Sequence, residues 1–509
     1  MATTPSLAMI PSGYKEEKLY SFLPMPSYSD VELVTNGTFD ADSDWNVNSN
    51  WLISGSTATC DGTSNDDINQ NQNIGVIGKS YAISFTIISI TQGSVAVRIG
   101  GSATNYYTEA GTYTESVTAT TTDRIRVSVQ GNAIASIDNV SIKEVTGLNK
   151  PRLDYSDSSC PSLLLEPTRT NLIAHSEDFS NSYWTKSGSS VVSGVVSPDG
   201  STNAFKLVES STTAGHFLNT ANMSVTSGTT YSEFIYAKKG ENNRIQMAFG
   251  FDTFSDSYAN FDLNLGIVVK ENNCIAKIEL ISNGWYKCSA SATCTTTGNN
   301  DVVPALINSD TATRLASYTG DGTSGLYIWG AQLEEGSYAT SYIPTTDGIV
   351  KTRLQDVCNS AGDSSTFNDS EGVLFAEINA LSYPVGSNNW LTITDGTSQN
   401  SVAILFESTS YVVGRIDIGG VNQAYLTKEI DYSDFTKVAF KYKQNDFALW
   451  INGVEVATDT SGNTFNANTL NSLQFSYGGG GNNWSGQCKD LRVYDVALTD
   501  LELAELTTI

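Results

Sequence analysis

Basic residues are scarce in this sequence: 28 Lys and Arg stand against 54 Asp and Glu, giving a formal net charge of −26. Nucleic-acid recognition needs clustered cationic side chains against phosphate, and anionic membrane surfaces attract the same charges. The composition therefore excludes both as partners. No window approaches the roughly twenty apolar residues that span a bilayer, so no membrane insertion is expected. Such acidity is typical of a soluble protein displayed in many copies, with divalent-cation binding as the alternative.

Histidine and patterned cysteine are also lacking. Only two histidines occur, His175 and His216, and neither lies in a nucleophile or metal context. Seven cysteines cannot all pair in disulfides, and they form no CxxC motif, so we interpret them as apolar filler in a protein assembled in a reducing host cytoplasm. They are Cys60, Cys160, Cys274, Cys288, Cys294, Cys358 and Cys488. Neither a G-x-S-x-G turn nor a Walker-type phosphate loop is present.

Paired carboxylates are the remaining route to catalysis, because glycoside hydrolysis needs only two at a fixed separation. The nearest candidates, Asp66-Asp67 and Glu334-Glu335, are adjacent in the chain. Adjacent side chains on a strand point to opposite faces, so neither pair would converge on one bond. We therefore predict no catalytic residues and no required cofactor, with a polysaccharide depolymerase as the alternative.

Helical periodicity is almost absent, and residues 498–507 alone carry apolar residues at helical spacing. Charged residues make up 16% of the 509, while aromatics reach 10%. Together with the Ser, Thr, Asn and Gly content, this favours short strands with polar outer faces. A chain of this length holds two to four domains, so we predict an all-β protein of several sandwiches.

The first thirty residues contain four prolines and no periodic pattern. They also lack the basic and apolar regions of a secretory signal. A segment of this kind cannot fold by itself, so we predict an arm over residues 1–30 that docks on another protein or a neighbouring copy.

An internal repeat follows the arm. Each copy opens with a Phe before a Trp, continues with Gly-x-x-Tyr at the start of a strand, and has a third Gly-aromatic block before a closing strand. The matching landmarks are Phe39 and Trp45 against Phe179 and Trp184, Gly78 to Tyr81 against Gly228 to Tyr231, and Gly111 to Tyr113 against Gly284 to Tyr286. Two β-sandwiches of common origin are expected.

The first copy, residues 31–146, resembles jelly-roll carbohydrate-binding modules. The resemblance rests on the opening "NGTF" at Asn36 and the closing "IDNVSI" at Ile137. The second copy is more diverged, with Trp329-Gly330 where the acidic pair would stand. The family often carries a structural Ca²⁺ between opening and closing strands, which would place Asn36 and Asp138 at the ion. An ordinary strand-end aspartate is the alternative.

Two further phrases resemble segments of bacteriophage virion proteins. They are "CPSLLLEPTRTNL", which begins at Cys160, and "GAQLEEGSYATSYIPT", which begins at Gly330. This resemblance implies a virion protein displayed as a fibre, spike or capsid decoration on the exterior surface. It also implies contact with other virion proteins through residues 1–30 and a homo-oligomer, with a trimer favoured.

The third domain, residues 371–509, resembles the concanavalin and laminin-G-like lectin fold. The resemblance rests on the Asn452-Gly453 hairpin and on the closing stretch "LRVYDVALTDLELAE". The complete prediction has six segments: the arm 1–30, a jelly roll 31–146, a linker 147–172, a diverged jelly roll 173–346, a linker 347–370 and the lectin-like domain 371–509.

Glycan-binding candidates follow from the pairing of aromatic faces with amides and carboxylates that sugar recognition uses. In the third domain, two Asn-Asn-Trp runs and a neighbouring Asp-Gly turn fit this chemistry, while the first sandwich offers further aromatic candidates. The predicted residues are Asn389, Trp390, Asp395, Asn483, Trp484, Trp51, Tyr106 and Tyr107. The alternative is that the tryptophans pack in the cores. We expect host-surface polysaccharide as the ligand, and a decoration protein without glycan binding stays open.

Overall fold

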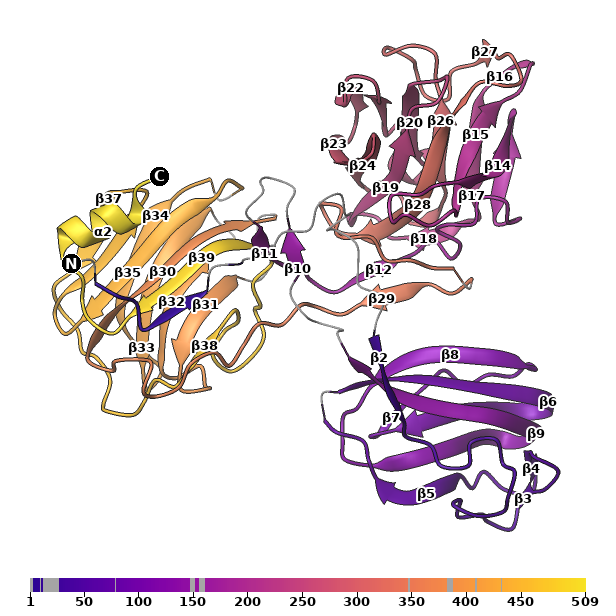
Figure 1. The fold of residues 1–509 in the computed structure, drawn as a ribbon, viewed down its shortest axis with the longest axis horizontal. Helices are drawn as coiled ribbons and strands as arrows, with labels where there is room; N and C mark the ends of the chain where they lie inside the picture. Colours follow the sequence, from indigo (N-terminus) through magenta and orange to yellow (C-terminus); the bar gives the residue numbers. More distant parts are fainter. Residues whose placement is uncertain are drawn as a thin grey trace. The chain divides into compact units, whose positions relative to one another are not determined.

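The computed structural model describes residues 3–9, 11, 27–77, 79–146, 152–154, 161–346, 348–381, 388–407, 410–431 and 433–509. The chain divides into two compact units, Pro24–Leu148 and the combination of Met1–Leu23 with Asn149–Ile509. Strands dominate both units (Figure 1), so the predicted all-β class is confirmed. Among the described residues, no helix has the length and apolar character needed to cross a membrane.

The unit over residues 24–148 is a rolled sandwich built around two long strands, β6 (Ser80–Ile99) and β9 (Arg124–Thr146). Register shifts at several points bend both strands, so each contributes to both layers around one core. The remaining strands are β2 (Ser27–Glu32), β3 (Trp51–Ile53), β4 (Ala58–Asp61), β5 (Ile68–Asn73), β7 (Ser102–Ala103) and β8 (Gly111–Thr118). Of these, β2, β4 and β5 pair with β9, β7 and β8 pair with β6, and β3 pairs with β4.

The second sandwich encloses its core between two antiparallel sheets. One sheet has the order β13 (Trp184–Ser187), β17 (His216–Thr220), β26 (Val302–Leu306), β20 (Arg244–Phe249), β21 (Tyr258–Asp262) and β22 (Ile267–Asn272). The other has the order β14 (Ser189–Val195), β15 (Ala204–Glu209), β28 (Gly325–Glu335), β19 (Thr230–Lys238), β24 (Trp285–Thr293) and β23 (Ile275–Ser282). Shorter elements are β16 (Thr213–Ala214) with β27 (Tyr318–Thr319), β18 (Met223–Val225) with β25 (Gly298–Asn300), and the helical turn α1 (Phe251–Phe254).

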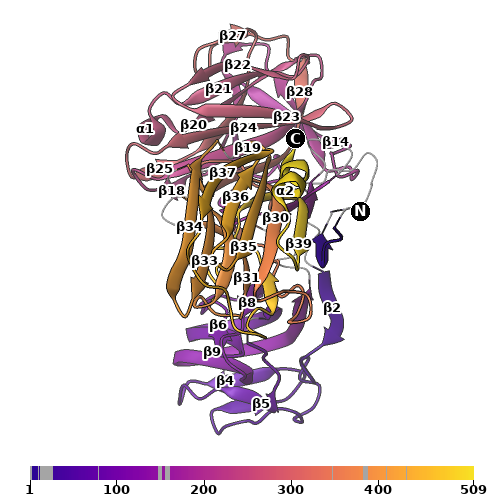
Figure 2. The same ribbon diagram turned by 90° about the vertical axis from the view of Figure 1, so that its left-hand side faces the viewer.

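The C-terminal sandwich also has two layers around one core (Figure 2). The larger sheet has the order β10 (Arg152–Asp154), β11 (Ser162–Leu165), β39 (Gly486–Tyr494), β30 (Glu371–Ala380), β35 (Thr436–Lys443), β36 (Phe447–Ile451) and β37 (Val454–Asp459). The smaller sheet has the order β34 (Val421–Glu429), β33 (Tyr411–Ile418), β32 (Ser401–Phe406), β31 (Asn389–Thr394) and β38 (Ser472–Gln474).

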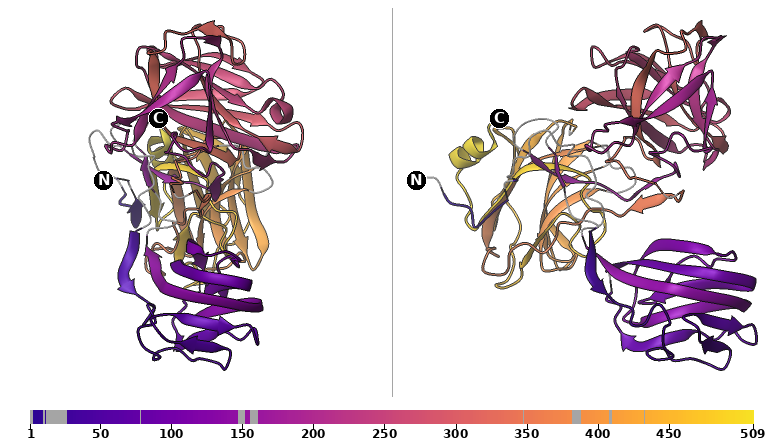
Figure 3. Two further views of the ribbon diagram at one scale, coloured as in Figure 1. Left: turned by 90° about the vertical axis from the view of Figure 1, so that its right-hand side faces the viewer. Right: turned by 45° about the vertical axis from the view of Figure 1, so that its right-hand side comes forward.

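Helix α2 (Asp500–Thr507) confirms the predicted helical stretch. It begins with a capping box, in which the Thr499 hydroxyl accepts from the Glu502 amide while the Glu502 side chain accepts from Thr499. The helix lies on the outer face of the larger sheet (Figure 3), where Trp450, Phe375 and Leu503 form a second apolar cluster.

The predicted linkers require correction, because parts of both belong to sheets. Strands β10 and β11 extend the larger C-terminal sheet beside β39. A separate pair, β12 (Arg169–Asn171) and β29 (Lys351–Arg353), joins the two linkers to each other. In these strands the backbone groups pair within sheets, whereas an unstructured linker would leave them to water, so we call the two segments connectors.

The predicted arm also requires correction. Strand β1 (Leu7–Met9) pairs with Val493 to Leu491 of β39 in the same chain, beside the stretch of that edge covered by β11. Residues 27–30 belong to β2 of the first sandwich. An exposed strand edge tends to pair with other chains, and here the chain's own upstream segments cover it. Most of the arm lies outside the described residues.

The repeat is confirmed by matching hydrogen bonds in the two sandwiches. The Trp45 indole donates to Asn36 O at 3.0 Å, and the Trp184 indole donates to His175 O at 2.7 Å. In each copy, the backbone carbonyl of the following residue accepts a hydrogen bond from the closing strand. Gly37 O accepts from Val140 N, and Ser176 O accepts from Ala331 N, both at 2.9 Å. Shared sequence landmarks therefore hold the same backbone positions.

Cysteines in the described part of the chain are all free thiols, and Cys160 lies outside it. Cys60, Cys288 and Cys488 are buried within the three sandwich cores. Burial raises the pKa of each of these thiols. This confirms their interpretation as apolar filler.

Candidate functional site

The two Asn-Asn-Trp runs lie side by side at one end of the C-terminal sandwich. Asn389 is the first residue of β31, and Asn483 lies just before β39. The Asn389 side-chain amide donates to Ser485 O at 3.2 Å, which ties the two segments together. The fold therefore brings together two loops that lie about a hundred residues apart in the chain.

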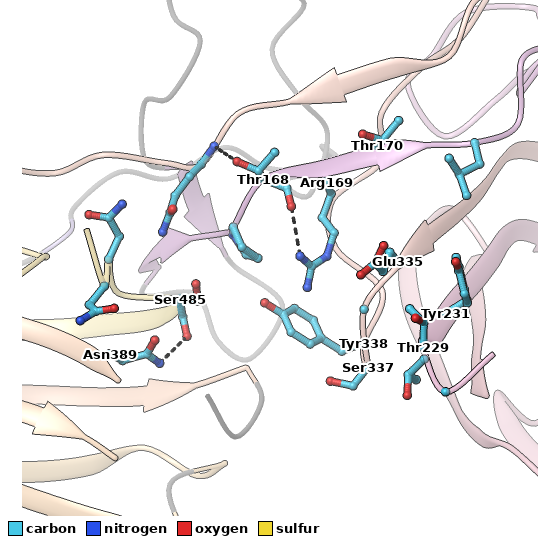
Figure 4. Close-up of a pocket in the computed structure, with 18 of the residues that line it drawn as sticks. Thr168, Arg169, Thr170, Thr229, Tyr231, Glu335, Ser337, Tyr338, Asn389 and Ser485 are labelled. Atoms are coloured by element: carbon cyan, nitrogen blue, oxygen red, sulfur yellow. Dashed lines mark hydrogen bonds between the residues drawn. The ribbon is translucent and has the colours of Figure 1, made fainter. Parts of the chain in front are cut away.

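A cavity of about 960 Å³ opens beside these asparagines. The connector around β12 and two loops of the second sandwich complete its wall (Figure 4). Side chains that can bind a polar ligand there include Arg169, Tyr231, Glu335, Tyr338, Asn389 and Asn483. This volume lies at the upper end of the range for small-molecule sites, about 300–1,000 Å³.

Arg169 is the cation of the cavity wall. Its guanidinium lies 5.6 Å from the centre of the Tyr338 ring, and its Nη1 donates to Thr168 O at 3.0 Å. The buried Nε of Arg169 has no hydrogen-bond partner among the described residues. Gly336 lets this side chain approach, because a Cβ there would lie 2.6 Å from Arg169 Nη2. The cation is therefore positioned by stacking and close backbone packing.

Glu335 supplies a carboxylate to the same wall. It is exposed, whereas its neighbour Glu334 is completely buried and accepts from Thr340 N at 2.5 Å and from its hydroxyl at 2.6 Å. The two acids thus face opposite ways, as predicted from strand geometry. Burial raises the pKa of the Tyr338 hydroxyl, which stays neutral and can both donate and accept. Cation, carboxylate, amides and phenol suit a ligand rich in hydroxyl groups.

Neither predicted tryptophan reaches the cavity. Trp484 is fully buried and packs against Phe406, with ring centres 4.8 Å apart. Trp390 follows Asn389 on β31 and therefore points to the other face of the sheet, where it packs on Tyr477 at 4.4 Å with Arg415 above it. With 4% exposure, Trp390 offers little surface to a ligand. The core alternative was correct for Trp484.

Asp395 builds a turn. Its carboxylate accepts from Thr397 N at 2.8 Å, from the Thr397 hydroxyl at 2.6 Å and from the Asn400 amide at 2.7 Å. Burial acts to raise the pKa of this carboxyl, but these hydrogen bonds outweigh it and the pKa is lowered. Asp395 does not line the cavity.

The aromatic candidates of the first sandwich are mostly engaged in packing. Trp51 is 5% exposed and its indole donates to Asp66 O at 2.6 Å, which corrects its prediction as a glycan contact. Tyr107 stacks on Tyr113 with ring centres 3.6 Å apart and donates to Glu115. Tyr106 is half-buried and stays a prediction.

The predicted calcium ligands satisfy other groups. The Asn36 amide donates to Ala41 O at 2.7 Å and Ser43 O at 3.0 Å, closing a loop. Asp138 accepts from the backbone and side chain of Asn139. In the part of the chain that the structure describes, no group of three or more His, Cys, Asp or Glu side chains could hold a metal ion. Ca²⁺ takes six to eight oxygens, of which these two side chains would supply only a part, so the calcium site stays a prediction.

Arg169, Tyr231, Glu335 and Tyr338 were not predicted as binding residues, although Tyr231 marks the repeat and Glu335 belongs to a carboxylate pair that was rejected as catalytic. Three of them, Arg169, Glu335 and Tyr338, lie in the two virion-like phrases. The resemblance of these phrases to known segments was the sequence signal that could have marked them as candidates. Their convergence across more than 160 residues, however, depends on the connectors pairing as β12 and β29.

A family model described as the concanavalin A-like lectin/glucanases superfamily matches residues 373–504. The C-terminal domain is therefore concanavalin A-like, as its sequence predicted.

Solved structures with similarity to the chain include carbohydrate-binding proteins. The CBM40 module of the Ruminococcus gnavus IT-sialidase, bound to α2,3-sialyllactose, is 17% identical over 29% of this chain and 93% of that one, with a TM-score of 0.25. A heptameric SAP-like pentraxin from Limulus polyphemus is 16% identical over 30% and 74%, with a TM-score of 0.25. Leech intramolecular trans-sialidase is 19% identical over 28% and 24%, also with a TM-score of 0.25. None of the curated proteins matches the sequence.

Proposed function

We propose that this protein binds glycan without cleaving it, through the cavity that the two asparagine loops share with Arg169. The observation that supports the proposal most is the convergence of Asn389 and Asn483 with Arg169 and Glu335 on one polar cavity. Amides and a carboxylate recognise vicinal hydroxyls, and the lectin-like fold of residues 373–504 is consistent with that ligand class.

We further propose that the protein is a bacteriophage virion component, displayed on the exterior as a fibre, spike or decoration. The support is the resemblance of its two phrases to virion segments. In the folded chain these phrases contact each other: Ser341 N donates to Glu166 at 2.9 Å, and the Asn171 amide donates to Ile343 O at 2.8 Å. They therefore form one connecting unit. A homo-oligomer, with a trimer favoured, would raise the avidity of weak single sites.

A glycan array probed with the full chain tests the binding proposal. We expect signal from a subset of bacterial surface polysaccharides, and at least a tenfold loss in Asn483→Ala and Arg169→Ala. Asn308→Ala is the matched control, because Asn308 is exposed on the second sandwich and does not line the cavity. Silence of the wild-type chain at high avidity would leave a decoration role without glycan binding.

Two further measurements separate the remaining alternatives. A fall in viscosity or release of oligosaccharide from a bound polysaccharide would establish a depolymerase. Light scattering of the purified chain gives its oligomeric state, and immunogold labelling of particles gives its position on the virion.

A further inference from the structure

Strand β5 of the first sandwich carries an uninterrupted run of amide side chains, Asn69 to Asn73. Asparagine is depleted in strands, so such a run needs another explanation than strand stability. The pairing with β9 also breaks within it: Asn69 lies opposite Arg126, whereas Asn73 lies opposite Arg124. Three residues of β5, Gln70 to Gln72, therefore stand against one residue of β9.

This irregularity turns amide side chains away from the regular hydrogen-bonded pairing of β5 with β9. Bulges often redirect side chains in this way beside binding sites. The segment borders a pocket of about 290 Å³ whose lining includes Trp45, Asn46, Gln70, Asn71 and Gln72. The pocket belongs entirely to the first sandwich and is separate from the cavity beside Asn389.

Internal hydrogen bonds hold part of the amide wall in place. The Gln70 amide donates to Thr35 O at 2.5 Å, and its oxygen accepts from Thr35 N at 3.3 Å. The Asn46 amide donates to Asn69 at 3.0 Å and to Asn71 at 2.5 Å. The exposed Gln72 side chain makes no hydrogen bond to the described residues, so its donor and acceptor both remain for a ligand.

The rest of the lining combines apolar side chains with Thr35 and Asp44, and it carries no positive charge. Trp45, Leu33 and Ile74 contribute to the wall, and the Trp45 ring is fixed by Phe39, whose centre is 5.3 Å away. Asp44 is the ionisable residue among the described lining residues, and none of them is cationic. A pyranose ring has the same character, with hydroxyls around its rim and C–H groups on its faces. A carboxylate-bearing sugar would be repelled by Asp44.

We propose that this pocket is a second binding site, specific for one uncharged pyranose residue. Its volume is at the lower end of the range for ligand sites, about 300 Å³, and admits a single ring rather than a chain. Gln72 and Asn71 would contact the hydroxyls, while the half-buried Leu33 and Ile74 support the ring. The site goes beyond the proposed function of the C-terminal cavity, and each of the two sites can fail without the other.

Saturation-transfer NMR and titration of the full chain with monosaccharides test the proposal. The probes are methyl α-D-glucoside, methyl α-D-galactoside, methyl α-D-mannoside, N-acetylglucosamine and, as the charged comparison, glucuronate. We expect saturation transfer to at least one neutral probe and none to glucuronate. Gln72→Ala should raise Kd about fivefold to tenfold, the effect of losing one hydrogen bond to the ligand.

Two sets of variants make the outcome specific to this pocket. Gln130→Ala removes another exposed glutamine of the same sandwich and should leave Kd unchanged. Asn483→Ala and Arg169→Ala should also leave it unchanged, which separates this site from the C-terminal cavity. The proposal is overturned by absence of transfer to every neutral probe, by equal transfer to glucuronate, or by an unchanged Kd in Gln72→Ala.

Discussion

The Arg353 guanidinium lies 2.6 Å from a carboxylate oxygen of Glu166, although 187 residues separate them. Both side chains are almost fully buried, and the same carboxylate pairs with Arg152, which in turn lies 2.7 Å from Asp356. The second Glu166 oxygen accepts from Ser341 N at 2.9 Å. One glutamate therefore joins both connectors to the closing segment of the second sandwich.

Replacing this glutamate should destabilise the connectors strongly. Glu166→Gln leaves Arg152 and Arg353 buried with a single carboxylate, and breaking a buried pair costs about 3–5 kcal/mol. We expect a lower midpoint of chemical denaturation and faster proteolysis within residues 152–171. Limited proteolysis with mass spectrometry locates the opened segment.

An exposed ion pair provides the comparison. Lys79 and Glu144 lie 2.8 Å apart with side chains 47% and 31% exposed, so Glu144→Gln should cost less than about 1 kcal/mol. Equal effects of the two substitutions would contradict a central role for Glu166.

The repeat predicts equal effects at two tyrosines. Tyr81 Oη accepts from Val76 N at 2.9 Å, and Tyr231 Oη accepts from Thr226 N at 3.2 Å, each five residues upstream. Phenylalanine at either position leaves the amide without its partner, at a cost of about 1–2 kcal/mol. Differential scanning calorimetry should show similar shifts for the transitions of the two sandwiches.

Tyr106→Phe is the control. The Tyr106 side chain is half-buried, and its hydroxyl makes no hydrogen bond to the described residues. A loss at Tyr81 without one at Tyr231 would show that the copies have diverged in how they hold this strand.

The sequence predicted those features that repeat or that follow strand periodicity. Phe39 with Trp45 and Phe179 with Trp184 marked equivalent positions, and the alternation of Glu334 and Glu335 followed from the pleat. The connectors could not be predicted, because β10, β12 and β29 have three residues each. Strands this short are too short to show an alternation of apolar and polar residues. They form only because they pair with segments far away in the sequence.

Only part of the candidate site could be predicted, because the rest also depends on contacts between segments far apart in the sequence. Asn389 and Asn483 stood out by their neighbouring tryptophans, yet those tryptophans point elsewhere. Arg169 and Tyr338 acquire their role only when the connector and the second sandwich meet. The local sequence pattern identified the loops of Asn389 and Asn483. The rest of the cavity wall depends on the pairing of segments far apart in the sequence.

Trp484 should behave as a core residue and not as a glycan contact. Trp484→Ala empties a fully buried site beside Phe406 and should cost about 3–5 kcal/mol of stability. Trp484→Phe keeps most of the packing and should retain glycan-array signal at 25 °C. Loss of signal in Trp484→Phe at unchanged melting temperature would instead place the indole on the ligand.

Glu233 lies fully buried in the second sandwich, and neither carboxylate oxygen has a hydrogen-bond partner among the described residues. Burial raises the pKa of this carboxyl well above its ordinary value of 4.5, against the opposing field of Arg314, while Asp301 adds to the rise. The folded state therefore holds a proton that the unfolded chain releases. Its stabilising effect is complete below the unfolded pKa and is lost as pH rises through the folded pKa.

Glu233→Gln removes this titration. Between pH 4.5 and the folded pKa, the wild type should lose about 1.4 kcal/mol per pH unit relative to the variant. The melting temperature of Glu233→Gln minus that of the wild type should therefore increase from pH 4 to pH 8. Glu241→Gln, at an exposed pair with Lys206, should show no such trend. A constant difference between Glu233→Gln and wild type across this range would mean that Glu233 is charged in the fold, because only a proton taken up on folding gives the slope.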